Sequence, residues 1–241
     1  MPMYQYVKVH ANRPMPRTLI ISFFFMGIGI ILLLWVIWPI LSFHFVSAPL
    51  LAAITSPLAS HKTTSVFPAS EIVYAGAEKS QTRVDYTNPN VWFPLKPQKK
   101  TTAKVTAYTL TIPKLRINNA ISIIGGDDLN NGIVHYGGTA LPGENGNGAL
   151  FGHSVLPQFF DTKNYKTIFS TLPTLEIGDD IFIKYDGITY RYTVENMSIR
   201  SPEDLSMLEQ QYDDSYITLV TCVPPGTYWQ RLHVRARLAK I

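Results

Sequence analysis

The only cysteine of the chain, Cys222, follows an apolar run at residues 217–221. A Pro-Pro-Gly turn comes next, and a second strand-like run begins at Arg231, nine residues after the cysteine. This pattern predicts a buried strand, a turn and a second strand. Arg231 would then lie across a hairpin from the strand that carries the thiol. A lone thiol at the end of a strand is a candidate nucleophile.

A thiol nucleophile needs a partner for proton transfer, and His153, in the sequence Phe-Gly-His-Ser, offers one. A thiolate can attack a peptide carbonyl, form a thioester-like intermediate and pass the acyl group to an amine. An imidazole can protonate the leaving amine and later accept a proton from the incoming one. Arg231 is always charged, so it can stabilise the oxyanion together with backbone amides. We therefore predict that Cys222, His153 and Arg231 are catalytic.

The alternative is that Cys222 is a small core residue without chemistry. Three features argue against this alternative. The cysteine lies at the boundary of a strand and a turn, Arg231 lies across the predicted hairpin, and the chain is expected to be exported. An exported cysteine without an intrachain partner is either paired with another molecule or kept as a thiol for a purpose.

Three segments carry a resemblance to a known family: Thr-Leu-Val-Thr-Cys222, Gln-Arg231-Leu-His-Val-Arg and the stretch from Gly137 to Ser154 that contains Gly-His153-Ser. Over about residues 108–238 they resemble the sortase family of surface transpeptidases, in the family's order of His, Cys and Arg. The resemblance implies an eight-stranded β-barrel and the same three catalytic roles. The short connection between Cys222 and Arg231 is similar to that of class C, D and E members. A second hydrophobic span of the usual class C kind is missing at the carboxyl end, which favours a housekeeping or class D/E-like anchoring role.

The activity that the resemblance implies is cleavage of a C-terminal sorting signal in secreted proteins and transfer of the new acyl end to an amine on the cell envelope. Two alternatives remain: a thiol protease, a hydrolase that releases the product to water, and a non-catalytic surface-binding module. We expect no cofactor and no metal site. The acidic pairs Asp127-Asp128, Asp179-Asp180 and Asp213-Asp214 lie next to turns, where solvated carboxylates are common, although some sortases bind calcium.

Other residues compete for roles in the site. His135, in Val-His-Tyr-Gly-Gly-Thr, is a candidate for binding substrate, with a structural hydrogen-bonding role as the alternative. Thr221, next to the cysteine, is a second candidate for substrate binding, although small polar residues at strand ends commonly satisfy the backbone. Arg235 and Arg237 share strand parity with Arg231, and the spacing of the family favours Arg231.

The chain of 241 residues divides into four predicted parts: a cytoplasmic tail at 1–18, a transmembrane helix at 19–41, a stalk at 42–104 and a catalytic domain at 105–241. The apolar run is long enough to cross a bilayer. Lys8, Arg13 and Arg17 precede it and no Lys or Arg follows until Lys62, which predicts a cytoplasmic amino terminus and an extracellular domain. A cleaved signal peptide is the alternative. The net charge of +4 is modest and no basic helix is present, so we expect no nucleic-acid partner.

The sequence of the domain shows short strand-like runs separated by turn residues. This pattern predicts an all-β fold, either a barrel or a sandwich, with short helices. The resemblance specifies the sortase barrel. An Asp-Gly pair at 186–187 predicts a tight hairpin turn. Short helices are expected at 165–172 and, after the capping pattern Ser-Pro-Glu-Asp, at 201–210. The stalk is interpreted as a spacer, with the alternative that the apolar cluster at 91–95 docks on the domain as a strap or lid.

Overall fold

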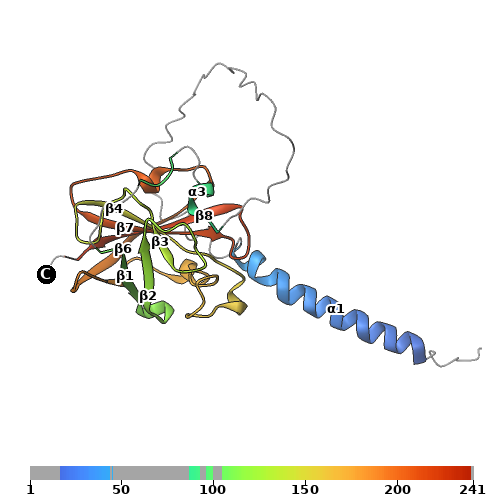
Figure 1. Ribbon diagram of the computed structural model, residues 1–241. Helices are drawn as coiled ribbons and strands as arrows, with labels where there is room; N and C mark the ends of the chain where they lie inside the picture. Colours follow the sequence, from blue (N-terminus) through green and yellow to red (C-terminus); the bar gives the residue numbers. More distant parts are fainter. Residues whose placement is uncertain (1–16, 44, 46–86, 93–95, 100–104, 240–241) are drawn as a thin grey trace, which may run out of the picture. The chain divides into compact units, whose positions relative to one another are not determined.

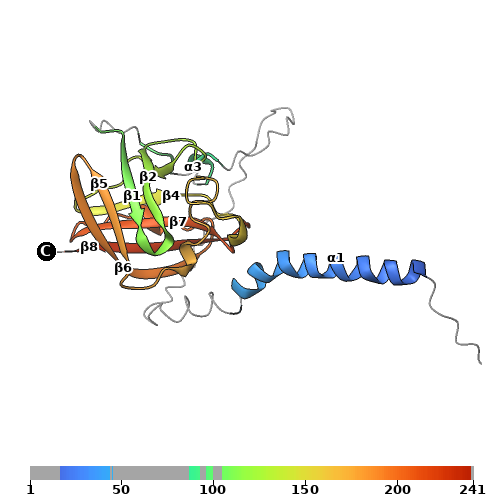
Figure 2. The same ribbon diagram turned by 90° about the horizontal axis from the view of Figure 1, so that it is seen from below.

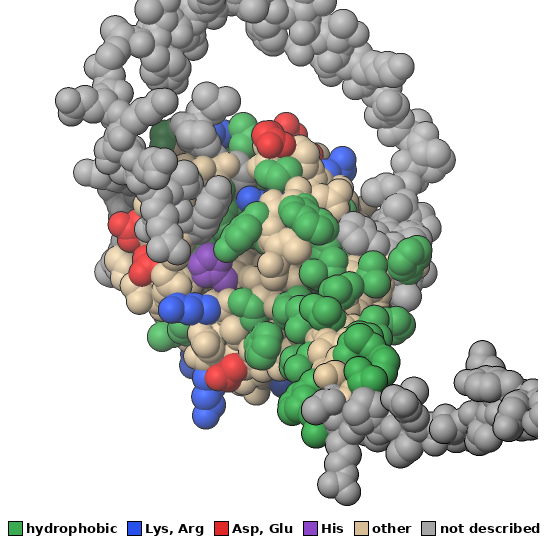
Figure 3. Space-filling view, turned by 90° about the vertical axis from the view of Figure 1, so that its right-hand side faces the viewer, with side chains coloured by type: hydrophobic (Ala, Val, Ile, Leu, Met, Phe, Trp, Pro, Cys, Tyr) green, Lys and Arg blue, Asp and Glu red, His purple; other side chains and the backbone are tan. Residues whose placement is uncertain are grey.

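The computed structural model describes residues 17–43, 45, 87–92, 96–99 and 105–239. The chain forms two compact units, Met1–Leu41 and Ser42–Ile241. In the first unit, helix α1 (Arg17–Ser42) has almost entirely hydrophobic side chains, most of them exposed; hydrophobic side chains are green in Figure 3. The stretch Ile21–Ser42 is long and apolar enough to cross a membrane, which agrees with the span predicted at 19–41.

The second unit is built on a closed barrel of eight strands (Figure 1). The strands are β1 (Ala107–Ile112), β2 (Ile117–Ile124), β3 (Ile133–His135), β4 (Gly146–Phe151), β5 (Asp180–Tyr185), β6 (Ile188–Arg200), β7 (Ser215–Val223) and β8 (Gln230–Leu238). One short α-helix, α3 (Pro89–Trp92), precedes them among the described residues. Short 3₁₀ turns lie at Pro113–Leu115, Pro157–Phe159, Leu172–Thr174 and Ser206–Leu208.

The strand order around the barrel is β1-β2-β3-β4-β7-β8-β6-β5 (Figure 2). The pairs β2–β3 and β4–β7 are parallel, and the other neighbouring pairs are antiparallel. The predicted tight turn joins β5 and β6, with Asp186 at φ 48° and Gly187 at φ 79°, as a hairpin turn with positive φ at both central residues requires. The prediction of an eight-stranded barrel is confirmed.

Alternation along β7 separates two apolar clusters. Ile217, Leu219 and Val223 point into the barrel and belong to its main core. Val220 and Cys222 point outward and join a smaller cluster on the outer face of the sheet. The members of this outer cluster come from β3, β4, β7 and the segments that cover them: Trp92, Leu129, Val134, Tyr136, Ala149, Phe151, Met207, Leu208, Val220 and Cys222. The only thiol therefore lies outside the barrel, beneath covering segments.

The predictions of short helices at 165–172 and 201–210 are wrong. Residues 165–171 form turns before the 3₁₀ turn at Leu172–Thr174. The backbone N–H of Phe169 donates to the carbonyl of His153 at 3.0 Å, so this segment is tied to the end of β4. Residues 201–210 contain only the 3₁₀ turn at Ser206–Leu208. Its buried Met207 and Leu208 pack in the outer cluster, and such tertiary contacts override a local helix signal.

Described residues of the predicted stalk pack against the barrel. The N–H of Leu129 donates to the carbonyl of Thr87 at 2.9 Å, and the Gln98 side chain donates to the carbonyl of Gly126 at 2.9 Å. The same side chain accepts from the N–H of Gly137 at 2.8 Å. In the predicted strap at 91–95, the described residue Trp92 packs in the outer cluster, and residues 93–95 lie outside the described part, so the strap stays a prediction.

Candidate active site

The β7–β8 hairpin places Cys222 directly opposite Arg231 in an antiparallel register. Both side chains leave the outer face of the sheet, and both residues are nearly buried, at 3% and 4% exposure. Directly opposed residues on one face have Cβ atoms about 4.5–5.5 Å apart. The strand register therefore holds the Arg231 guanidinium next to the Cys222 thiol, and no flexible loop is needed to bring them together.

The end of β4 brings His153 to the level of the thiol. Phe151 pairs with Val220 in the parallel β4–β7 ladder, so two further residues along each chain lead to His153 and Cys222. Hydrogen bonds between the two chain segments continue beyond the β4–β7 ladder. The Gly152 N–H donates to the Val220 carbonyl at 3.2 Å, and the Ser154 hydroxyl donates to the Cys222 carbonyl at 2.7 Å. Because side chains alternate, the half-buried His153 shares the outer face with the thiol.

Glycine is required immediately before the histidine. A Cβ on Gly152 would lie 2.5 Å from Cδ2 of Phe169. Phe169 is fully buried in the main core, so its ring has no open space into which to retreat. The Gly-His pair in the sequence therefore has a packing cause as well as a place in the site.

The guanidinium of Arg231 is only partly satisfied. One terminal N–H group donates to the carbonyls of Tyr228 at 3.2 Å and Gln230 at 3.3 Å. Its buried Nε finds no hydrogen-bond acceptor among the described residues. A buried donor without a partner is costly. Arg231 is thus positioned to donate to an oxygen that arrives with a ligand.

Trp92, on the short helix α3, covers this group of residues. The guanidinium carbon of Arg231 lies 4.7 Å from the centre of the Trp92 ring, a cation–π geometry. The indole also lies edge-on to Phe151, with ring centres 5.8 Å apart, and 6.4 Å from the imidazole of His153. Trp92 is 8% exposed; Cys222 and Arg231 are buried, and His153 is half-buried.

Two opposing effects act on the thiol. Burial raises the pKa of Cys222 above its ordinary value, because a thiolate loses its hydration in this apolar cluster. The charge of Arg231 acts to lower the pKa of Cys222, and burial prevails. The covered site therefore favours the protonated thiol, and hydration of the site would favour the reactive thiolate.

The other predicted residues occupy different positions. His135 is buried at 1% exposure, with Nδ1 2.7 Å from the Tyr108 hydroxyl and Nε2 3.1 Å from the Thr139 hydroxyl. Burial lowers the pKa of His135 to about 4. The Thr221 hydroxyl donates to the Gly152 carbonyl at 2.8 Å. These contacts fit the structural alternatives for His135 and Thr221, and substrate binding by either residue stays a prediction.

Arg235 and Arg237 lie further along β8 and are engaged elsewhere. Arg235 forms an ion pair with Glu195 at 2.9 Å, and Arg237 forms one with Asp214 at 2.9 Å. Arg231 alone of the three is registered with the cysteine. Within the described part of the chain, no three His, Cys, Asp or Glu side chains cluster in the manner of metal ligands.

Sequence reasoning did not assign Trp92 to the site. The sequence indicates a possible strap around it, but the ring's position over Arg231 depends on contacts between segments remote in sequence. Nor did it find a polar cavity of about 440 Å³ next to the site, over β6, β7 and β8. The outward parity of His233 with Arg231 was the available signal for that cavity.

The comparisons with known proteins agree on one family. The family model for the sortase domain matches residues 110–239. A sortase D of Bacillus subtilis strain 168 is 30% identical over 118 residues, which cover 48% of this chain and 53% of the relative. A sortase A of Streptococcus agalactiae is 30% identical over 132 residues, which cover 54% of this chain and 52% of the relative. The chain thus spans about half the length of the curated relatives it matches.

Solved structures show the same fold. Sortase C-1 of Actinomyces oris has a TM-score of 0.50 and 28% identity, over 58% of this chain and 76% of that one. A sortase C1 structure from Streptococcus agalactiae has a TM-score of 0.51 at 24% identity, over 61% of this chain and 77% of that one. The structural neighbours of this closed barrel are therefore sortases. The chain belongs to the sortase family.

Proposed function

We propose that this protein is a membrane-anchored cysteine transpeptidase that cleaves a sorting signal in secreted proteins and joins the new acyl end to an amine on the cell envelope. The observation that carries the proposal is the registered pair Cys222 and Arg231, with His153 held level with the thiol at the end of β4. Family membership supports the transpeptidase class.

The proposed reaction has two half-reactions. In the first, the Cys222 thiolate attacks the scissile carbonyl, and the unpaired donor of Arg231 stabilises the oxyanion. The carbon–nitrogen bond breaks, His153 gives a proton to the leaving amine, and a thioester remains on the sulfur. In the second, an incoming amine loses a proton to His153, a new amide bond forms and the thiolate leaves.

Access to the thiol requires Trp92 to move. The indole lies against the Arg231 guanidinium and near His153, so a peptide carbonyl cannot reach both groups while the ring stays in place. Displacing the ring would also hydrate the thiol, which lowers the pKa of Cys222 and increases the thiolate fraction. Substrate binding and thiol activation are therefore coupled in this proposal.

The proposed location follows from α1. Its apolar stretch Ile21–Ser42 would anchor the chain, and the excess of Lys and Arg before it would keep the amino terminus in the cytoplasm. The barrel would then face the outside, where secreted proteins and envelope amines are present. Protease added to cells with an intact membrane tests this orientation: we expect it to digest the domain, and full protection of the domain would contradict the proposed location.

The test of the activity uses the full chain in detergent micelles with a library of sorting-signal-like peptides, each with and without a primary amine. We expect the amine to yield ligated product, and Cys222→Ala to lose at least about a thousandfold in rate, because it removes the nucleophile. Cys222→Ala must keep the melting temperature of the parent chain for the comparison to count. Full cleavage by this variant would contradict the mechanism.

The thiol peptidase remains the second candidate, since it needs the same three residues. The two activities differ in the second half-reaction alone. If product forms only by hydrolysis, at a rate independent of amine concentration, the peptidase is the correct function.

A further inference from the structure

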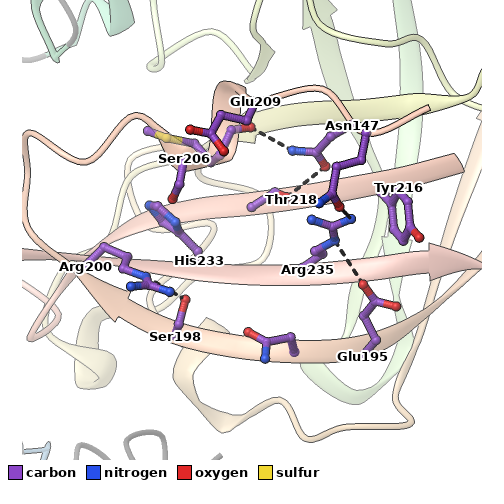
Figure 4. A pocket seen from close by; sticks show the side chains of 13 residues that line it. Asn147, Glu195, Ser198, Arg200, Ser206, Glu209, Tyr216, Thr218, His233 and Arg235 are labelled. Carbon is purple, nitrogen blue, oxygen red and sulfur yellow. Dashed lines mark hydrogen bonds and ion pairs between the residues drawn. The ribbon is translucent and has the colours of Figure 1, made fainter. Parts of the chain in front are cut away.

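The two edges of β7 are paired differently near the thiol. On the β8 edge, the antiparallel register continues through Cys222. Figure 4 shows these two strands side by side, with Thr218 on β7 and His233 on β8. On the β4 edge, the parallel register ends at the pair of Phe151 and Val220, two residues before the thiol. The chain that carries the predicted catalytic histidine therefore reaches the site beyond the end of the backbone ladder.

Residues 152–155, which we call the histidine segment, continue beside β7 after β4 ends. The first residue of this segment, Gly152, keeps two hydrogen bonds to β7. Its N–H donates to the Val220 carbonyl at 3.2 Å, and its carbonyl accepts from the Thr221 hydroxyl at 2.8 Å. A side-chain donor thus continues the cross-strand bonding where the regular pairing stops. These two bonds hold the segment on the amino-terminal side of the histidine.

Ser154 holds the histidine segment on the other side of the histidine. Its hydroxyl donates to the carbonyl of Cys222 at 2.7 Å, a length typical of a well-formed O–H···O hydrogen bond. Cys222 is 3% exposed, so little water can reach its carbonyl and replace the serine hydroxyl. This bond therefore joins the residue next to His153 directly to the cysteine.

Two further hydrogen bonds tie the histidine segment to the connection between β4 and β5. The carbonyl of His153 accepts from the N–H of Phe169 at 3.0 Å, and the N–H of Val155 donates to the Ser170 hydroxyl at 2.9 Å. Neither of these bonds reaches β7. Ser154, in contrast, fixes the segment against the strand that carries the thiol. Ser170 offers a matched control, because its hydroxyl bonds the same segment from a different side.

Proton transfer in the proposed mechanism depends on the spacing of the histidine and the thiol. Cys222 attacks the scissile carbonyl and His153 gives a proton to the leaving amine, so the two side chains must reach adjacent atoms of one peptide bond. A displacement of about 1 Å can cost about a hundredfold in rate. Because His153 lies beyond the β4–β7 pairing, its height along β7 depends on the bonds on either side of it.

We propose that Ser154 is a positioning residue: its hydrogen bond to the Cys222 carbonyl holds His153 level with the thiol beyond the end of the β4–β7 ladder. This inference rests on the proposed transpeptidase function. Ser154 acts through His153 and not on the substrate. Removal of its hydroxyl should therefore slow the steps in which His153 transfers a proton and spare a step that needs no such transfer.

The experiment compares two donors in the full chain in detergent micelles, and both have the most active peptide of the library as their acyl part. In the amide donor, the leaving amine needs a proton from His153. In the p-nitrophenyl ester donor, the thiolate attacks the carbonyl, the carbon–oxygen bond breaks and p-nitrophenolate leaves as an anion without a proton. The measured quantity is the rate at which Cys222 is acylated by each donor.

Ser154→Ala should slow acylation by the amide about fivefold to twentyfold and acylation by the ester less than about twofold. Ser154→Thr keeps a hydroxyl donor and should return the amide rate to within about threefold of wild type. Alkylation of Cys222 by iodoacetamide should match wild type in Ser154→Ala, because the access and the ionisation of the thiol are unchanged. Loss of folded protein would lower both donor rates equally, so the ratio of the two rates measures positioning.

Ser170→Ala is the matched control, since it removes a hydroxyl that bonds the histidine segment without reaching the cysteine. This control should keep the ratio of wild type. An amide rate equal to wild type in Ser154→Ala, or an equal loss with both donors, would overturn the inference. Absence of an acyl adduct from either donor in wild type would instead refute the proposed function.

Discussion

In the β7–β8 hairpin, Cys222 and Arg231 are fixed by backbone register, whereas Trp92 reaches the same pair from a helix of four residues. The hairpin is a continuous antiparallel ladder between the main core and the outer cluster. Helix α3 is held by side-chain packing and a few hydrogen bonds. Elements with fewer buried contacts open at lower free energy. The hairpin therefore positions the reactive groups, and α3 controls access to them.

The first prediction tests the role of Arg231 in the β7–β8 hairpin. Arg231→Lys keeps the positive charge but loses the stacked planar group and its several donors, so we expect kcat/KM for donor cleavage to fall about a hundredfold. Arg191→Lys, on the exposed part of β6, is the matched control and should stay within about twofold. Parental activity in the Arg231→Lys variant would show that charge alone suffices.

The second prediction concerns the link between β4 and the histidine. Gly152→Ala places a methyl group 2.5 Å from the Phe169 ring, and we expect overpacking to lower the free energy of unfolding by about 1–3 kcal/mol. Gly126→Ala is the control, because its new Cβ would meet side-chain atoms of Ile123 at 3.2 Å. Denaturant unfolding in detergent measures both. Equal stability of the two variants would refute the packing argument.

The third prediction sharpens the role of α3. Trp92→Ala should raise the rate of Cys222 alkylation by iodoacetamide at pH 8 about threefold to tenfold, because it uncovers and hydrates the thiol. Trp229→Ala is the matched control, since Trp229 is 60% exposed in the connection between β7 and β8.

The pH profile of the same reaction separates uncovering from activation. Only the thiolate reacts, and burial raises the pKa of Cys222, so the wild-type rate should keep increasing at pH values above the ordinary thiol pKa. Hydration in Trp92→Ala should move the midpoint to lower pH. If the alkylation rate of Trp92→Ala increases by the same factor at every pH and the midpoint of the pH profile is unchanged, Trp92 blocks access without altering the pKa of the thiol.

The strands that carry the chemistry were predictable because their side chains alternate. The apolar run before Cys222 and the parity of Arg231 depend only on neighbours in sequence, and β7 and β8 form where the sequence predicts them. Strand β4 ends at Phe151, immediately before the Gly-His pair. Local pattern and final fold agree there.

The covering segments were not predictable in the same way. Residues 201–210 have a capping pattern, yet burial of Met207 and Leu208 against the sheet replaces the expected helix by a 3₁₀ turn. Trp92 lies in a stretch with no period of 2 or 3.6, and its place over Arg231 arises from tertiary contacts. The polar cavity over β6, β7 and β8 depends on the spacing of three strands, which the amino-acid composition does not reveal.

The most direct test of the central claim is intact-protein mass spectrometry of the full chain mixed with a sorting-signal-like peptide and quenched at short times. The account predicts an acyl adduct on Cys222 that disappears faster as amine concentration increases, with ligated product appearing at the same rate. An adduct on another residue would contradict the role of Cys222. So would amine-ligated product formed by Cys222→Ala at the rate of the parent chain.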